Sequence, residues 1–143
     1  MAPKLLVAAF AADDRPHVDK AIRNGIDVRI LDCFEDTHAQ VQSWYKHRCI
    51  HVPAHRLSVK GAVQQERFDM AVIREGNYDF VRTALLAQTL RDAKVEEVVV
   101  ISSDHSKIPI YRRCGAHQVI VSENLSDFWS QFDLTAMSHV SAS

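Results

Sequence analysis

The sequence predicts a single α/β domain with three layers and a mainly parallel central sheet. Apolar runs of strand length alternate with segments of helical periodicity from one end of the chain to the other. The strongest run, Val98–Ile101, has no polar alternation, which is typical of a strand that helices cover on both faces. A length of 143 residues suits one domain of this kind.

The first part of the chain supplies three expected strands and two expected helices. Lys4–Ala12 is a continuous apolar run, and we expect a buried first strand there. Asn24-Gly25 is a good stop for the first helix, and Asp36-Thr37 is a good start for the second. The expected elements are a strand over 4–12, a helix over 17–24, a strand over 26–33, a helix from 36 to about 48 and a strand over 49–52.

Residues 54–75 allow two interpretations, a hairpin or a strand with a short helix, because their apolar residues fit neither period well. The pattern is clear again beyond this stretch. We expect a helix over 79–93, a strand over 95–102, a short helix over 109–114, a strand over 118–122 and a last helix over 125–132. The domain should therefore span residues 1–134, with a flexible polar tail over 135–143.

The composition excludes several classes of protein. Hydrophobic residues make up 47% of the chain and charged residues 24%, which are globular values. No apolar run approaches the ~20 residues that span a bilayer, so we expect no membrane association. The cysteines Cys33, Cys49 and Cys114 are odd in number and far apart, so we expect reduced thiols and a cytoplasmic protein.

The net charge of −1 is a cancellation between two parts of the chain. Residues 37–65 contain no Asp or Glu, whereas the rest of the chain holds 13 basic and 18 acidic residues. A basic strip of this kind would hold the backbone of a nucleic acid. Its members are Lys46, Arg48, Arg56 and Lys60.

Three aspartates are expected at the carboxyl ends of the strands, where parallel sheets bind ligands. Asp13 follows the first strand, Asp104 follows the strand over 95–102, and Asp79 begins the helix before that strand. Mg²⁺ and Mn²⁺ prefer such oxygen ligands, so these three residues are the predicted metal ligands. Asp14 is the alternative to Asp13, and an aspartate after a strand also commonly caps a helix.

Two motifs resemble the NYN family of PIN-like nucleases. They are Glu-Gly-Asn-Tyr-Asp-Phe-Val over 75–81, and Val-Val-Val-Ile-Ser-Ser-Asp-His-Ser-Lys-Ile-Pro-Ile over 98–110. The resemblance implies a PIN-like, Rossmann-like parallel sheet and hydrolysis of RNA with Mg²⁺ or Mn²⁺ as cofactor. It also implies that Asp13, Asp79 and Asp104 are the catalytic residues as well as the metal ligands.

The chain departs from the NYN motifs at several positions. Ser103 replaces a glycine, Ser106 replaces the second acid, Lys107 replaces an aromatic residue, and Leu85 stands where a further acid is expected. A catalytically weakened RNA-binding relative is therefore the other form of this hypothesis. Ser103 and Ser106 would donate hydrogen bonds to phosphate oxygens and complete the expected substrate-binding residues with the basic strip.

The alternative resemblance is to response-regulator receivers, which have a flavodoxin-type sheet. Asp13-Asp14 resembles their acidic pair, and residues 114–121 resemble their turn into the last strand. The expected lysine is absent after that strand, and Arg74 stands where the phospho-acceptor aspartate should be. This resemblance implies a non-phosphorylated regulatory or protein-interaction domain.

Two further patterns bear on ligands and partners. His47, His51 and His55 recur every four residues, but Pro53 interrupts any common helix, so we expect no zinc site from that spacing. The aromatic residues of the last helix, Trp129 among them, suit a core or an interface, which leaves a homo-oligomer possible.

Overall fold

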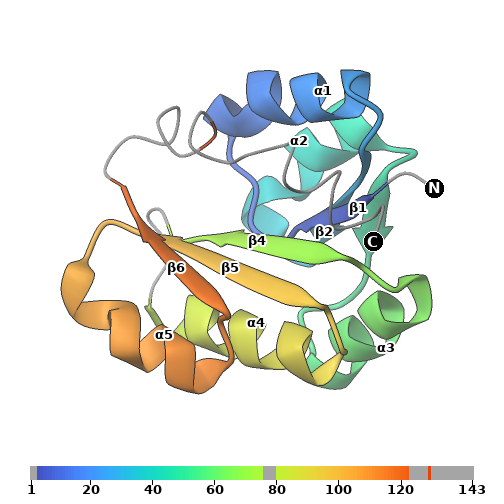
Figure 1. The fold of residues 1–143 in the computed structure, drawn as a ribbon. Helices are drawn as coiled ribbons and strands as arrows, with labels where there is room; N and C mark the ends of the chain where they lie inside the picture. The colour runs from blue at the N-terminus through green and yellow to red at the C-terminus, as the bar shows by residue number, and fades with distance from the viewer. Residues whose placement is uncertain (1–2, 76–79, 123–128, 130–143) are drawn as a thin grey trace.

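The computed structural model describes residues 3–75, 80–122 and 129, and its centre is a six-stranded, all-parallel sheet (Figure 1). The strand order is β3-β2-β1-β4-β5-β6. The strands are β1 (Lys4–Val7), β2 (Asp27–Asp32), β3 (Cys49–His51), β4 (Met70–Arg74), β5 (Glu97–Ser102) and β6 (Gln118–Val121). The helices are α1 (Arg15–Arg23), α2 (Glu35–Tyr45), α3 (Arg56–Glu66), α4 (Phe80–Asp92) and α5 (Ile108–Cys114), with short 3₁₀ turns η1 (Ala12–Asp14) and η2 (His105–Lys107).

The helices form an outer layer on each face of the sheet. Figure 1 shows α1 and α2 on one side, and α3, α4 and α5 on the other. Two separate apolar clusters fill the spaces between the layers, one beneath each set of helices. The predicted α/β fold with three layers and a parallel sheet is confirmed.

The central strands lack alternating polar residues because helices cover both faces of the sheet. Successive side chains of a strand point to opposite faces, and here each face is covered. Leu6 lies in the cluster under α3–α5, and its neighbour Leu5 lies in the cluster under α1 and α2. Likewise, Val98 lies in the cluster under α3–α5 and Val99 lies in the cluster under α1 and α2. All four side chains are at most 1% exposed. Both faces therefore require apolar residues.

The ambiguous stretch over 54–75 is a helix followed by a strand. α3 buries Val59 and Val63 against the sheet, and β4 then joins the sheet beside β1. Arg67 ends the helix with a φ of 58°, a left-handed conformation that stops helical hydrogen bonding. The hairpin interpretation was wrong, because β4 pairs in parallel with β1 and β5 and not with the preceding segment.

Several expected boundaries differ from those observed. The first strand ends at Val7 rather than at residue 12, although Ala8, Ala9 and Phe10 stay buried. Of the expected last helix only Trp129 is described, and it is buried in the cluster under α1 and α2. The start of the 79–93 helix and the tail over 135–143 lie outside the described residues. None of the described helices is long and apolar enough to cross a membrane.

Candidate functional site

The carboxyl edge of the sheet gathers charged side chains where β1, β4 and β5 end. The chain crosses to opposite faces of the sheet after β1 and after β4, so a topological switch point lies between these neighbouring strands. Ligands of open α/β sheets bind in the crevice at such a point. Asp13 and Asp14 follow β1, Arg74 ends β4, and Ser102 ends β5.

Arg74 reaches across the switch point to both aspartates. Its Nη1 lies 2.6 Å from Asp13 Oδ1, and its Nη2 lies 3.3 Å from Asp13 Oδ2. The same Nη1 lies 3.5 Å from Asp14 Oδ2. The hydrogen bond from Arg74 holds the pKa of Asp13 below its ordinary value. The predicted metal-ligating aspartate of the first strand is thus held by a guanidinium.

Asp14 is the inner member of the pair, at 3% exposure. Its carboxylate accepts hydrogen bonds from the Ala11 backbone amide at 3.1 Å and from Trp129 Nε1 at 3.3 Å. Burial raises the pKa of Asp14 in spite of the Arg74 guanidinium nearby. Asp13 is largely exposed, so the two neighbours differ sharply in environment although both contact Arg74.

Glu75, directly after β4, is a second buried carboxylate with partners of its own. The Tyr111 hydroxyl of α5 donates to Glu75 Oε2, and the Ser102 hydroxyl donates to Oε1 at 3.1 Å. Lys107 Nζ lies 3.4 Å from Oε1. These contacts fasten α5 to the ends of β4 and β5. Neither Glu75 nor Tyr111 was among the site residues predicted from the sequence.

Asp104 serves the chain turn after β5. One of its oxygens, Oδ1, accepts hydrogen bonds from the Ser106 amide at 2.9 Å and from the Ser106 hydroxyl at 2.7 Å. These bonds from Ser106 lower the pKa of Asp104, and they make Asp104 the N-cap of η2. Ser103, the other serine predicted to bind substrate, is exposed.

The structure does not bring the predicted metal ligands together in one described group. Asp79 lies outside the described residues. Asp13 and Asp104 follow β1 and β5, which β4 separates, and each is occupied by another partner. The set Asp13, Asp79 and Asp104, and Mg²⁺ or Mn²⁺ as its ion, remain a prediction.

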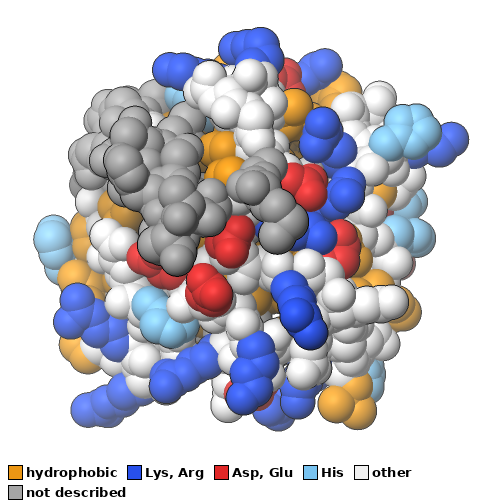
Figure 2. All heavy atoms as spheres, turned by 45° about the vertical axis from the view of Figure 1, so that its right-hand side comes forward, with side chains coloured by type: hydrophobic (Ala, Val, Ile, Leu, Met, Phe, Trp, Pro, Cys, Tyr) orange, Lys and Arg blue, Asp and Glu red, His pale blue; other side chains and the backbone are white. Residues whose placement is uncertain are grey.

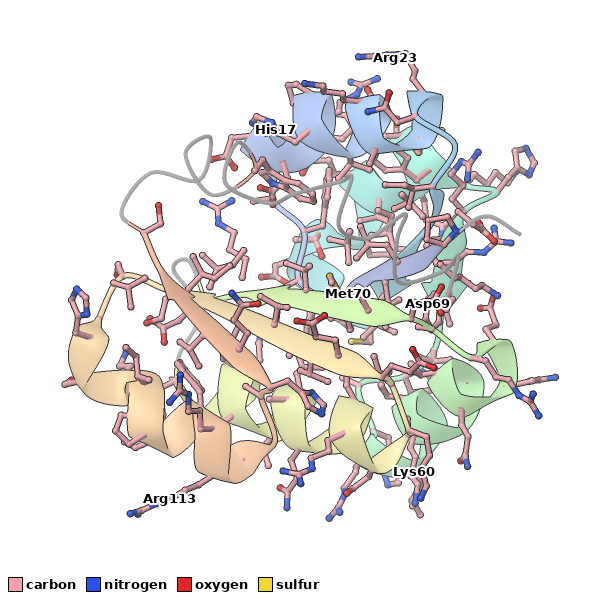
Figure 3. The ribbon with its side chains drawn as sticks, in the orientation of Figure 1. His17, Arg23, Lys60, Asp69, Met70 and Arg113 are labelled. Atoms are coloured by element: carbon pink, nitrogen blue, oxygen red, sulfur yellow. The ribbon has the colours of Figure 1, made fainter. Side chains whose placement is uncertain are left out.

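The basic strip is dispersed over the surface. Lys46 is exposed after α2, and Arg48 lies 3.9 Å from Asp27 at the start of β2. Arg56 pairs with Asp92 at 2.8 Å, and Lys60 points away from the sheet (Figure 3). On the face drawn in Figure 2, the visible Lys and Arg side chains are interspersed with Asp and Glu. Binding of RNA by this strip remains a prediction.

A different cluster lies where β2 and β3 end. Asp32 is paired in register with His51, and His38 stands in the first turn of α2. Asp32 Oδ2 is 2.7 Å from His38 Nδ1 and accepts from Gln42 Nε2 at 2.8 Å, and the rings of His38 and His51 are 4.7 Å apart. One possible ligand atom from each of Asp32, His38 and His51 lies within 4.8 Å of the others.

This β2–β3 cluster is missing from the sequence-based predictions. It borders an open cleft of about 770 Å³. Among the described residues it is the only group of three His, Cys, Asp or Glu side chains with such spacing. The sequence signal was a polar residue at the end of each of two neighbouring strands, but their pairing requires the strand order.

Residues of α3 and α4, together with Phe34, line an apolar groove of about 350 Å³. Val81 and Leu85, which line it from α4, are more than half exposed, and so is Leu57 on α3. Exposed apolar side chains that line a groove are typical of a surface that contacts another molecule.

No family model matches the chain, and no curated protein matches it either. Solved structures do match in fold. The NAD(P)-binding domain of an exopolyphosphatase-related protein from Archaeoglobus fulgidus has a TM-score of 0.63 and 16% identity, with 97% of this chain and 98% of that chain covered. The GsuK channel bound to NAD also has a TM-score of 0.63, at 11% identity, with 84% of this chain covered. This chain spans only 21% of the channel's length.

Two further structures complete the comparison. The TrkA-N domain of inner membrane protein ybaL from Escherichia coli has a TM-score of 0.60 and 10% identity, with 93% and 98% of the two chains covered. A CheY-like response regulator receiver domain from Methanospirillum hungatei has a TM-score of 0.54 and 13% identity, with 99% and 98% covered. The likeness establishes a Rossmann-like and receiver-like α/β fold.

Proposed function

We propose that this chain is a receiver-like regulatory or protein-interaction domain that is not switched by phosphorylation. The observation that carries the proposal is the ion pair of Arg74 with Asp13, together with the approach of the same guanidinium to Asp14. An arginine stands at the strand end where a receiver places its phospho-acceptor aspartate. The chain supplies a fixed positive charge at the place where a receiver binds its divalent cation.

The strand order is compatible with this proposal but does not by itself favour it. The full order β3-β2-β1-β4-β5-β6 is the order of the Rossmann fold, and its part without the edge strand β3, β2-β1-β4-β5-β6, is the flavodoxin and receiver order. In that order β4 is the strand after the switch point, and Arg74 is its last residue. A divalent cation would have to displace the guanidinium from Asp13 before it could bind, at a cost in both charge and hydrogen bonds.

Dinucleotide binding, named for two of the fold neighbours, fits the residues of this chain less well. A Rossmann site needs a glycine-rich turn after β1, so that the backbone can approach a pyrophosphate. Residues 8–14 contain no glycine, and the side chains of Ala8, Ala9 and Phe10 are buried there. Asp13 and Asp14 also place negative charge just before α1, at the position that a pyrophosphate would occupy. We do not propose NAD as a cofactor.

The ribonuclease hypothesis has less support than the receiver-like one. Its first-strand acid is neutralised by Arg74, and Asp104 is engaged by Ser106. The fold neighbours include a receiver domain, an NAD(P)-binding domain and a channel bound to NAD, and none of the four is named as a nuclease. The apolar groove between α3 and α4, in contrast, offers the kind of surface that an interaction domain needs.

The test is a phosphorylation assay on the full chain. The purified protein is incubated with a small acyl phosphate and Mg²⁺, and its intact mass is measured beside that of a receiver that accepts phosphate. We expect no phosphorylated form of this chain, and no cleavage of single-stranded RNA with Mg²⁺ or Mn²⁺. Phosphate that is stably attached to an aspartate, or metal-dependent RNA cleavage that Asp104→Asn abolishes, would overturn the proposal.

A further inference from the structure

The cluster at the ends of β2 and β3 contains a buried carboxylate. Asp32 is 1% exposed, and its Oδ2 accepts from Gln42 and contacts His38. Its other oxygen, Oδ1, is buried and has no hydrogen-bond partner among the residues that the structure describes. A buried carboxylate oxygen without a partner is costly, because it has lost its water and gained nothing in return. Such an oxygen favours binding of a cation or of a hydrogen-bond donor.

The neighbouring side chains are of the type that binds transition metals. His38 and His51 place their rings 4.7 Å apart, and each has one nitrogen in the group of ligand atoms around Asp32. Two imidazoles and one carboxylate form a ligand set that suits Zn²⁺ and leaves a fourth position open. Gln42 donates to Asp32 Oδ2 and would orient the carboxylate, as residues behind metal ligands commonly do.

We propose that Asp32, His38 and His51 hold one divalent transition-metal ion, for which Zn²⁺ is the natural probe. The three ligands come from the end of β2, the first turn of α2 and the end of β3, so the register of the sheet fixes two of them. The open cleft beside them gives an ion access from solvent. The site is independent of the Arg74 ion pair and of the function proposed above.

The charges around the cleft favour a cation. Glu35 and Asp36 line it together with Asp32, and Arg82 is the one basic side chain among its described lining residues. Arg82 contacts two other lining residues of the cleft, with Nη1 3.6 Å from Asp36 and the guanidinium stacked over Phe34 at 4.1 Å. Cys33 also borders the cleft, but it is not one of the three residues whose ligand atoms lie within 4.8 Å of one another.

The test is a metal titration of the full chain without an affinity tag. Zn²⁺ binding is measured by calorimetry against a competing chelator, and Co²⁺ binding by the visible absorption of the metal. We expect one ion per chain. His38→Ala and His51→Ala should each weaken binding by at least about 100-fold, and Gln42→Ala by about tenfold. His47→Ala and Cys33→Ser are the matched controls and should bind as the wild type does.

Circular dichroism of the metal-free variants separates loss of a ligand from loss of the fold. His51 is exposed, so His51→Ala should fold normally even if a change at Asp32 does not. The proposal is overturned if the wild type binds no Zn²⁺ at micromolar concentration. It is also overturned if folded His38→Ala and His51→Ala bind as tightly as the wild type, because the three side chains would then be only a hydrogen-bonded cluster.

Discussion

The carboxylates at the two halves of the carboxyl edge, one at β1, β4 and β5 and the other at β2 and β3, differ in their hydrogen-bond and ion-pair partners. Where β1, β4 and β5 end, each carboxylate has a partner within the protein: Arg74 for Asp13 and Asp14, and Tyr111 and Lys107 for Glu75. Where β2 and β3 end, Asp32 lies beside an open cleft and has one buried oxygen with no partner in the described part of the chain. We call the first half closed, because side chains of the protein itself occupy its carboxylates. In the second half, a buried carboxylate oxygen is still able to bind a ligand.

This difference changes what the switch point of the sheet can do. In a Rossmann or receiver fold the crevice beside β1 is the expected place for a ligand. In this chain an arginine occupies that place, and the polar side chains that remain available lie one or two strands away, at β2 and β3. The fold alone therefore does not locate the site, and the partners of each carboxylate must be considered.

The largest expected effect concerns the closed half. Tyr111→Phe removes the hydroxyl that donates to Glu75 and leaves a buried carboxylate oxygen without that partner. We expect a loss of about 3 kcal/mol in the free energy of unfolding, measured with urea. The control is Tyr45→Phe, whose hydroxyl donates to the partly exposed Asp19 and should cost about 1 kcal/mol or less. Equal effects of the two changes would show that Glu75 is not held as described.

A smaller effect is expected at Arg74. Arg74→Met keeps the apolar part of the side chain and removes the charge that faces Asp13 and Asp14. We expect a loss of about 2 kcal/mol, since charge-assisted hydrogen bonds to the exposed Asp13 and an ion pair with the buried Asp14 disappear. Thermal and urea unfolding measure the loss. Arg113→Met is the control, because Arg113 points away from the end of α5 and should change stability little (Figure 3).

The pH dependence of stability should separate the two aspartates. The pKa of Asp14 is raised in the folded state, so its contribution to stability is fullest below its unfolded pKa and is lost as pH rises through the folded value. The pKa of Asp13 is lowered, so its contribution is present above the unfolded pKa and is lost as pH falls through the folded value. The free energy of unfolding of Asp14→Asn, relative to that of the wild type, should therefore be higher at pH 7 than at pH 4.

The measurement for this pair is urea unfolding of Asp13→Asn and Asp14→Asn from about pH 2 to about pH 7, because the folded pKa of Asp13 lies below its ordinary value of 3.8. Asp13→Asn should show the opposite trend: its loss in the free energy of unfolding, relative to the wild type, should grow as pH rises from acid to neutral. Its effect should be modest, because Asp13 is largely exposed to solvent. Parallel pH profiles for the two variants would contradict the different environments assigned to these neighbours.

The strands of the sheet could be predicted from the sequence because the apolar pattern that marks each strand lies within a few consecutive residues. Runs such as Val98–Ile101 are apolar at every position, and only a strand covered on both faces explains that. α3 was harder to predict, since it holds Gly61 and an exposed Leu57 that blur the helical pattern of Val59 and Val63. The strand order and the register are not local, and neither could be read from the pattern.

The site was less predictable than the fold for the same reason. Arg74 and Asp13 are 61 residues apart, and their ion pair depends on β4 lying beside β1. The register of β2 and β3 places Asp32 opposite His51. The helical spacing of His47, His51 and His55 in the sequence does not indicate that pairing. The resemblance to receivers predicted that Arg74 stands at the phospho-acceptor position, and the proposed function rests on that prediction together with the observed partners of Arg74.

The most direct test of the central claim is a Mg²⁺ titration of the wild type and Arg74→Asp, followed by thermal unfolding. Arg74→Asp places a third carboxylate beside Asp13 and Asp14 and removes their cation. We expect a variant that is destabilised without Mg²⁺ and recovers in millimolar Mg²⁺, while the wild type is unaffected. A wild type that Mg²⁺ stabilises as much as it stabilises the variant would contradict the claim that Arg74 holds the place of the metal.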